Sequence, residues 1–153
     1  MSYNFIIDSY AWIDYFIGSK GGAVAKAYIE GEDSATPSIV VAEISRKLLY
    51  EISAGRETVE GRENKLDFMK TSTLIVDLTE EIARLAGEID VERKKTVKGW
   101  GMADSITLAT ARKEGAKIVT GDRHFMDLKG EIIPIYSYEP EETESERSSN
   151  SSS

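Results

Sequence analysis

Short runs of β-branched and other apolar residues alternate along the chain with longer stretches in which apolar residues recur at helical spacing. The short runs predict β-strands, and the longer stretches predict amphipathic helices. The predicted strands are residues 4–8, 34–37, 73–78, 117–121 and 131–136. The predicted helices are residues 9–18, 22–32, 39–54, 57–72, 80–95 and 102–114. This alternation favours an α/β fold, a three-layer sandwich in which a central parallel sheet of about five strands is flanked by helices.

Individual residues mark the ends of several of these elements. Glycine is expected to end the first and the last predicted helix, at Gly18 and Gly115. Ser38 is expected to cap the helix that follows it, because its hydroxyl can accept a hydrogen bond from a backbone N–H of the first turn. Pro134 has no backbone N–H, which places the last strand at an edge of the sheet.

The chain has 153 residues, the size of one ordinary domain, which we expect to span residues 1–139. Residues 140–153 are rich in Ser and Glu and contain no large apolar side chain, so we interpret them as a disordered tail. No segment approaches the ~20 apolar residues of a membrane span, and Asp8 and Asp14 lie where a signal peptide would be apolar. We therefore expect a cytoplasmic protein with no membrane contact.

Composition narrows the chemistry that this chain can perform. It contains no cysteine, which excludes disulfides, thiolate zinc sites and cysteine nucleophiles. His124 is the only histidine, so one subunit cannot supply two imidazoles to a mechanism or to a metal. We interpret His124 as a surface residue or a neighbour of a metal ligand. The net charge of -8 argues against a broad basic face for non-specific nucleic-acid binding.

Two apolar strands each end in an aspartate, at Asp8 and Asp122. The carboxyl ends of parallel strands lie at one edge of a sheet, where ligand crevices form. Glu43 and Asp104 interrupt two apolar helices near their starts, which would lie at the same edge. Converging carboxylates repel one another and are costly to bury unless they are paired or coordinate a metal. A Mg²⁺ or Mn²⁺ site held by Asp8, Glu43, Asp104 and Asp122 is therefore the simplest interpretation.

Each of these four acids also has an ordinary structural explanation. Asp8 could simply cap the helix that follows it. Glu43 and Asp104 could be acids favoured in the first turns of their helices by the helix dipole. Asp122 could be a turn residue. The interpretation as a metal site therefore depends on all four occurring together.

Four short segments contain these acids: "FIIDSYAWIDYF" with Asp8 and Ser9, "VVAEI" with Glu43, "ADSITLATA" with Asp104, and "TGDRHF" with Asp122. Together, and in this order, they resemble the PIN-domain nucleases, and among these the short VapC-like toxins of toxin-antitoxin pairs. The resemblance covers most of the chain. Each segment is weak by itself, and it is the four in order that make the resemblance specific.

The resemblance implies a metal-dependent endoribonuclease that hydrolyses RNA phosphodiester bonds and leaves a 5′-phosphate and a 3′-hydroxyl. The implied catalytic and metal-binding residues are Asp8, Glu43, Asp104 and Asp122, which would hold one or two Mg²⁺ or Mn²⁺ ions, with Ser9 and Thr120 in supporting positions. The implied partners are an RNA substrate, a cognate antitoxin protein and a second copy of the chain in a homodimer.

RNA can approach an acidic pocket only if basic residues surround it and a metal offsets the carboxylates. The candidates for this substrate-binding ring are Arg46, Lys47, Lys94, Lys95, Lys98 and Arg123. For the basic run from Arg93 to Lys98, before Trp100, a solvated face is the simpler interpretation.

Two other kinds of function stay open. The first is a catalytically silent PIN-like binding module that acts through a protein or ribonucleoprotein partner, although the complete set of four acids argues against it. The second is a phosphoryl-transfer domain of receiver or dehalogenase type. Such a domain needs an aspartate nucleophile with an acidic neighbour, and no Asp-x-Asp pattern occurs in the chain.

Overall fold

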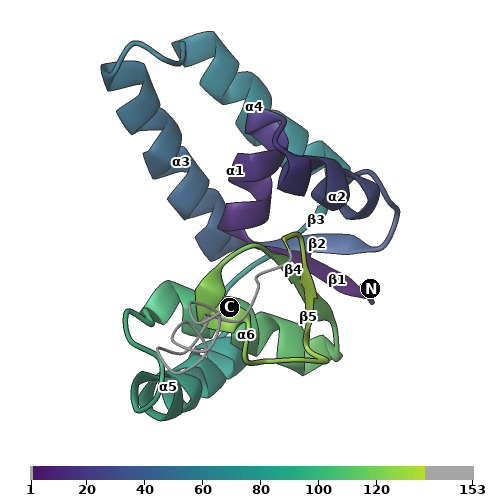
Figure 1. Ribbon diagram of the computed structural model, residues 1–153, viewed down its shortest axis with the longest axis vertical. Helices are drawn as coiled ribbons and strands as arrows, with labels where there is room; N and C mark the ends of the chain where they lie inside the picture. The colour runs from purple at the N-terminus through teal and green to yellow at the C-terminus, as the bar shows by residue number, and fades with distance from the viewer. Residues whose placement is uncertain (1, 137–153) are drawn as a thin grey trace, which may run out of the picture.

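A computed structural model of the chain describes residues 2–136. These residues form a three-layer α/β sandwich, with a parallel sheet between two layers of helices (Figure 1). The predicted fold class is thereby confirmed. The predicted tail, residues 140–153, lies outside the described residues.

The central sheet contains five strands, all parallel to their neighbours, in the order β3-β2-β1-β4-β5. The strands are β1 (Phe5–Ile7), β2 (Ser34–Pro37), β3 (Leu74–Val76), β4 (Lys117–Thr120) and β5 (Ile132–Pro134). The first strand in the sequence is the middle strand of the sheet, and β4 lies beside it although more than a hundred residues separate the two. Pro134 is in an edge strand, as its missing N–H requires.

Six helices connect and cover the strands within residues 2–136. They are α1 (Ser9–Ile17), α2 (Lys20–Ile29), α3 (Ser38–Ser53), α4 (Val59–Ser72), α5 (Glu80–Lys94) and α6 (Met102–Glu114). Helices α1 to α4 lie on one side of the sheet, and α5 and α6 lie on the other (Figure 1). A short 3-10 turn, Arg123–Phe125, follows β4.

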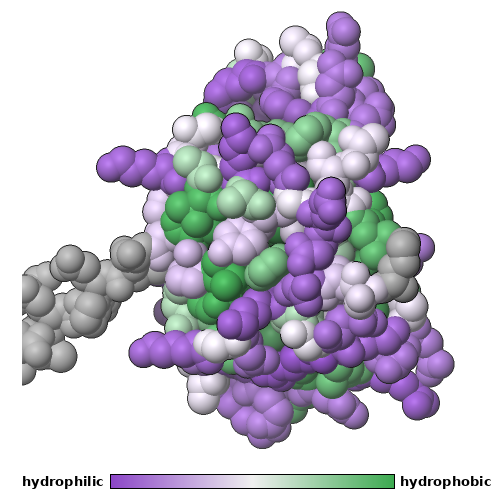
Figure 2. Space-filling model, turned by 90° about the vertical axis from the view of Figure 1, so that its right-hand side faces the viewer, coloured by the Kyte–Doolittle hydropathy of each residue, from purple (hydrophilic) through white to green (hydrophobic). Residues whose placement is uncertain are grey.

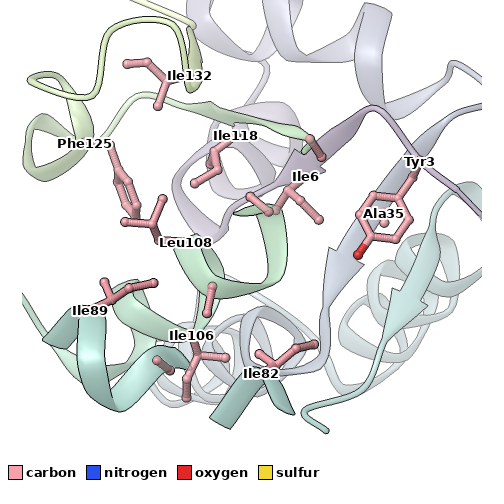
Figure 3. Packing of buried hydrophobic residues seen from close by; sticks show 14 of the residues in the cluster. Tyr3, Ile6, Ala35, Ile82, Ile89, Ile106, Leu108, Ile118, Phe125 and Ile132 are labelled. Atoms are coloured by element: carbon pink, nitrogen blue, oxygen red, sulfur yellow. The ribbon is translucent and has the colours of Figure 1, made fainter. Parts of the chain in front are cut away.

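The alternation of side chains along the strands divides the core into two clusters. Ile6 and Ile118 are neighbours on β1 and β4, and both point to the face covered by α5 and α6, where Leu108 and Phe125 complete the packing (Figure 3). The next residues, Ile7 and Val119, belong to the cluster under α1, α2 and α3. Because both faces of the sheet are covered at its centre, the inner residues of β1 and β4 are apolar on both sides.

Three predicted helix starts, those of α2, α3 and α4, are wrong by one or two residues. Helix α4 begins at Val59, because Thr58 is its N-cap and accepts a hydrogen bond from the N–H of Gly61. Pro37, in extended conformation, occupies the N-cap position of α3, so Ser38 is already the first helical residue and makes no capping hydrogen bond. Helix α2 begins at Lys20, because Ser19 accepts a hydrogen bond from the N–H of Gly22 and thereby caps a turn that contains two glycines. These glycines are required by close packing, since a Cβ on Gly22 would come within 2.1 Å of the carbonyl oxygen of Asp14.

The face of the molecule in Figure 2 is mostly hydrophilic, with small apolar patches between charged side chains. Among the helices of residues 2–136, none is long and apolar enough to cross a membrane.

Candidate active site

The carboxyl ends of β1 and β4 place two aspartates side by side. Ile7 and Val119 are paired in the sheet, so Asp8, which follows Ile7, lies beside Thr120, and Asp122 comes two residues later. Asp104 is in the first turn of α6, and Glu43 is in the second turn of α3. The electrostatic interactions of Asp8 with Asp122 and Glu43, and of Glu43 with Asp104 and Asp122, show that all four carboxylates meet at this carboxyl edge of the sheet. We call these four residues the acidic cluster.

Asp8 combines a capping role with a place in the acidic cluster. Its Oδ1 accepts a hydrogen bond of 2.9 Å from the N–H of Ala11, which caps α1, and its Oδ2 accepts one from the hydroxyl of Thr120. The side chain is buried, and this burial raises the pKa of Asp8 to about 8, with further upward contributions from Asp122 and Glu43.

Thr120 and Ser9 are the two residues predicted to support the acids, and both contact them. The Thr120 hydroxyl donates to Asp8 and accepts a hydrogen bond of 3.0 Å from the N–H of Asp122, so one side chain connects both strand-end aspartates. The Ser9 hydroxyl hydrogen-bonds the side chain of Glu43. Both hydroxyls therefore limit the orientations that the carboxylates can adopt.

Glu43 and Asp104 are partly buried and close to one another. Burial, followed by the charge of Asp104, raises the pKa of Glu43. Burial also raises the pKa of Asp104, although a hydrogen bond of 3.0 Å from the Gly101 N–H to its Oδ2 acts in the opposite direction. Asp104 is thus the first-turn acid of α6 and also part of the acidic cluster.

His124 lies against the acidic cluster. Its Nδ1 is 3.6 Å from Oδ2 of Asp104 and 3.5 Å from Oδ1 of Asp122, and its backbone N–H donates a hydrogen bond of 2.9 Å to the same Asp122 oxygen. The structure places His124, whose side chain is partly exposed, beside two of the acids that are predicted to bind a metal. The available signal is its position two residues after Asp122, because an aspartate in a turn accepts from the N–H two residues on.

The acidic cluster has the donor set of a divalent-cation site. Among the salt bridges of residues 2–136, none joins a lysine or arginine to any of its four members. Burial raises the pKa values of Asp8, Glu43 and Asp104, and a hard cation with oxygen ligands would offset the cost of ionising them. The residues present therefore fit a hard divalent cation. One ligand atom each from Asp104, Asp122 and His124 lie within 4.8 Å of one another, close enough to share one ion.

A family model describing the PIN domain matches residues 5–131, which include all four acids. The chain belongs to the PIN domain family. This confirms the resemblance found in the four segments. The search of curated proteins found no match.

Solved structures share the fold of this PIN domain at low sequence identity. A toxin-antitoxin complex from Klebsiella pneumoniae matches with a TM-score of 0.64 and 20% identity, over 88% of this chain and 100% of that one. VapBC2 from Rickettsia felis, bound to a promoter DNA fragment, matches with a TM-score of 0.64 and 18% identity, over 84% and 95% of the two chains. VapC20 from Mycobacterium tuberculosis, described as a toxin that cleaves the sarcin-ricin loop, matches with a TM-score of 0.62 and 17% identity, over 82% and 95%.

Two of the predicted substrate-binding residues of this PIN domain, Arg46 and Arg123, lie beside the acidic cluster. Arg46 lines a surface pocket with Ser9 and Glu43, and its charge lowers the pKa of Glu43. Arg123 is exposed next to Asp122. Lys98 precedes Gly99, where a Cβ would come within 3.1 Å of Nε2 of His124.

Three other predicted basic residues are paired with acids outside the cluster. Lys47 is 3.0 Å from Glu51. Lys94 is 3.0 Å from Asp90, and Lys95 is 2.9 Å from Glu92, both on α5. All three lysines are exposed, so these pairs are weak and an approaching phosphate could replace the acid.

Arg93 does not belong to a solvated face, and this part of the prediction is wrong. Its guanidinium is buried, donates hydrogen bonds of 2.6 and 2.8 Å to the carboxylate of Asp127, and donates a third of 2.7 Å to the carbonyl oxygen of His124. It also lies 4.5 Å from the ring of Trp100. Because arginine offers several donors in a rigid plane, Arg93 can fix the loop that carries Asp122 and His124.

Proposed function

We propose that this PIN domain is a metal-dependent endoribonuclease of the VapC-like toxin type. The observation that carries the proposal is the convergence of Asp8, Glu43, Asp104 and Asp122 at the carboxyl edge of the sheet. Membership of the PIN domain family supports the same function.

In the proposed site, Asp8, Glu43, Asp104 and Asp122 would hold one or two Mg²⁺ or Mn²⁺ ions. Such an ion supplies a water of lowered pKa near neutral pH and offsets the charge that develops on the phosphate. The chain itself fixes the ligands beforehand. The hydroxyl of Thr120 and the N–H of Ala11 hold the carboxylate of Asp8, and Ser9 holds that of Glu43.

The proposed substrate is RNA, whose phosphates would be attracted by the basic residues around the acidic cluster. Arg46 and Arg123 flank the carboxylates from the α3 side and the loop after β4, and Lys98 precedes the glycine that contacts His124. These side chains would position the backbone without selecting a sequence. In-line attack of water on phosphorus would leave a 5′-phosphate and a 3′-hydroxyl.

The proposed partners are a cognate antitoxin protein and a second copy of the chain, in the cytoplasm. Support comes from the solved structures that share the fold, among them a toxin-antitoxin complex and VapBC2. The assignment of these two partners rests on this likeness of fold. Light scattering of the purified chain, alone and with a co-expressed candidate antitoxin, tests it.

Cleavage of a mixed RNA pool by the purified chain tests the proposed function. We expect cutting with Mg²⁺ or Mn²⁺, none with EDTA, and none with Asp8→Asn, which keeps the shape of the side chain. Asp67→Asn is the matched control, because Asp67 is an exposed acid on α4, outside the acidic cluster, and this variant should cut normally. A folded chain, free of any partner, that cuts nothing in either metal would instead favour a binding module without catalysis.

A further inference from the structure

We propose that His124 is a nitrogen ligand of the metal in this site, through Nδ1, and that it shifts the preference of the site from Mg²⁺ toward Mn²⁺. This inference rests on the proposed function, because it assigns a further residue to the same metal site. It differs from the four-carboxylate site proposed above in adding an imidazole to an otherwise all-oxygen set of ligands.

The distances around His124 fit a shared metal ion. Nδ1 is 3.5 Å from an oxygen of Asp122 and 3.6 Å from an oxygen of Asp104. Two atoms that each bind one ion at ~2.1 Å lie about 3 to 4 Å apart. Nδ1 is also shielded from solvent, and its contacts with the two carboxylates are longer than ordinary hydrogen bonds. Nδ1 thus faces two carboxylate oxygens at distances that leave room for one ion bound by all three atoms.

The surroundings of His124 hold the ring in this orientation. Its N–H donates to Asp122, and its carbonyl oxygen accepts from the buried Arg93, so the backbone is fixed on both sides of the side chain. On the opposite edge of the ring, Gly99 approaches so closely that a Cβ there would lie 3.1 Å from Nε2 and 3.3 Å from Cε1. Gly99 has a φ of +83°, a conformation that favours glycine, which keeps this approach open.

Turning the ring over would not give an equivalent arrangement. The flipped imidazole would place the Cδ2–H group, instead of Nδ1, against Asp104 and Asp122. The orientation in the structure therefore places a ring nitrogen, and not a C–H group, beside the two acids. Only a nitrogen in this position can bind a cation together with them.

An imidazole ligand changes which metal the site prefers. Mg²⁺ takes oxygen ligands and retains its waters, whereas imidazole nitrogen is better suited to first-row transition metals. A set of carboxylates with one imidazole should therefore bind Mn²⁺ relatively more tightly than four carboxylates alone. Removing the imidazole should lower the ratio of Mn²⁺ affinity to Mg²⁺ affinity by about tenfold. This figure is the lower end of the losses of metal affinity that follow when a residue supporting a metal site is replaced.

Pulsed electron paramagnetic resonance of the Mn²⁺-loaded protein tests this inference without measuring activity. His124 is the only histidine of the chain, so in protein without a histidine tag any imidazole ¹⁴N coupling to Mn²⁺ must come from it. We expect this coupling in the wild type and in Lys129→Gln, a control at an exposed position of the same loop, and its loss in His124→Gln. Calorimetry on the same proteins should show the tenfold fall of the Mn²⁺ to Mg²⁺ ratio only in His124→Gln.

The outcomes separate this inference from the proposed function. Mn²⁺ that binds in a manner sensitive to Asp122→Asn, but without ¹⁴N coupling and with an unchanged affinity ratio in folded His124→Gln, would overturn the role of His124 and leave the carboxylate site intact. A wild-type protein that binds neither metal would overturn the metal site itself, and with it both proposals.

Discussion

The hydroxyl of Thr120 donates a hydrogen bond to Oδ2 of Asp8, a residue 112 positions away in the sequence. The same hydroxyl accepts the N–H of Asp122, so a single side chain joins the two aspartates that end the middle strand and its neighbour. One bond stabilises the carboxylate of Asp8, and the other fixes the backbone of Asp122.

Thr120→Val should separate the effect of the two Thr120 hydrogen bonds from the effect of its side-chain packing. Valine has nearly the same shape but can neither donate to Asp8 nor accept from Asp122, which leaves buried polar groups without partners. We expect a loss of about 1–3 kcal/mol in the free energy of unfolding, measured by urea denaturation. Thr120→Ser keeps the hydroxyl and should restore most of the loss of hydrogen bonding. Equal destabilisation by both variants would mean that the methyl group, and not the hydrogen bonds, matters.

Asp8→Asn should stabilise the metal-free protein while removing its activity. The folded-state pKa of Asp8 is raised to about 8, whereas the unfolded value is about 3.9. Between these values the folded protein holds the extra proton, so stability falls as the pH rises from about 4 to about 8, by at most about 1.4 kcal/mol per pH unit. Asn carries no such charge and can still accept from Ala11.

Thermal denaturation in EDTA between pH 5 and pH 8 measures this difference. The wild type should lose stability more steeply than Asp8→Asn, and both should retain the smaller slope due to Glu43 and Asp104, whose pKa values are also raised. Parallel pH profiles for the two proteins would show that Asp8 is ionised without penalty. Added Mn²⁺ should stabilise the wild type at pH 8 far more than the variant, because the ligand binds only the folded state.

Arg93→Lys should loosen the loop that carries Asp122 and His124. Lysine keeps the charge but cannot bond Asp127 with two parallel N–H groups, reach the carbonyl of His124 and stack on Trp100 at the same time. We expect about 1–3 kcal/mol of destabilisation and faster amide hydrogen exchange over residues 122–126. Arg84→Lys, at an exposed position of the same helix, is the control and should change neither quantity. Unchanged exchange in Arg93→Lys would show that the loop is fixed without Arg93.

Lys94→Ala combined with Lys95→Ala should weaken RNA binding in a salt-dependent way. Each lost phosphate contact should reduce the slope of log affinity against log salt concentration by about 0.7 for single-stranded RNA. Binding is measured in the Asp8→Asn background, in which the RNA stays intact. Lys113→Ala with Lys117→Ala is the control pair, because these lysines lie near the C-terminal end of α6 and at the start of β4, away from the acidic cluster. If the Lys94 and Lys95 double variant bound RNA with the same affinity as the parent protein at every salt concentration, these two lysines would have no role in RNA binding.

The sequence predicts the features of this fold that depend on local patterns. The strand-end position of Asp8 and Asp122 follows from two apolar runs, and the parallel sheet then brings both to one edge. Asp104 follows from the start of an apolar helix, whose predicted and observed bounds agree. The place of Glu43 in the acidic cluster does not follow from a local pattern, because its distance from the other acids depends on how α3 packs against the sheet.

The features that the sequence does not predict depend on contacts between distant segments. Arg93 belongs to the buried side of α5, at helical spacing from Ile82, Ala86 and Ile89, but the neighbouring lysines obscure this signal. Its partner Asp127 is 34 residues further along the chain. The approach of His124 to Asp104 likewise requires the loop between α5 and α6 to pack against the turn after β4, which no local pattern specifies.

Diffraction from crystals soaked in Mn²⁺ tests the central claim most directly. Data collected near the manganese absorption edge should show an anomalous difference peak among the carboxylates of Asp8, Glu43, Asp104 and Asp122, and no peak there in crystals of Asp122→Asn. Peaks only at other surface acids, with the acidic cluster empty at saturating Mn²⁺, would contradict the account of this carboxyl edge as a metal-dependent nuclease site.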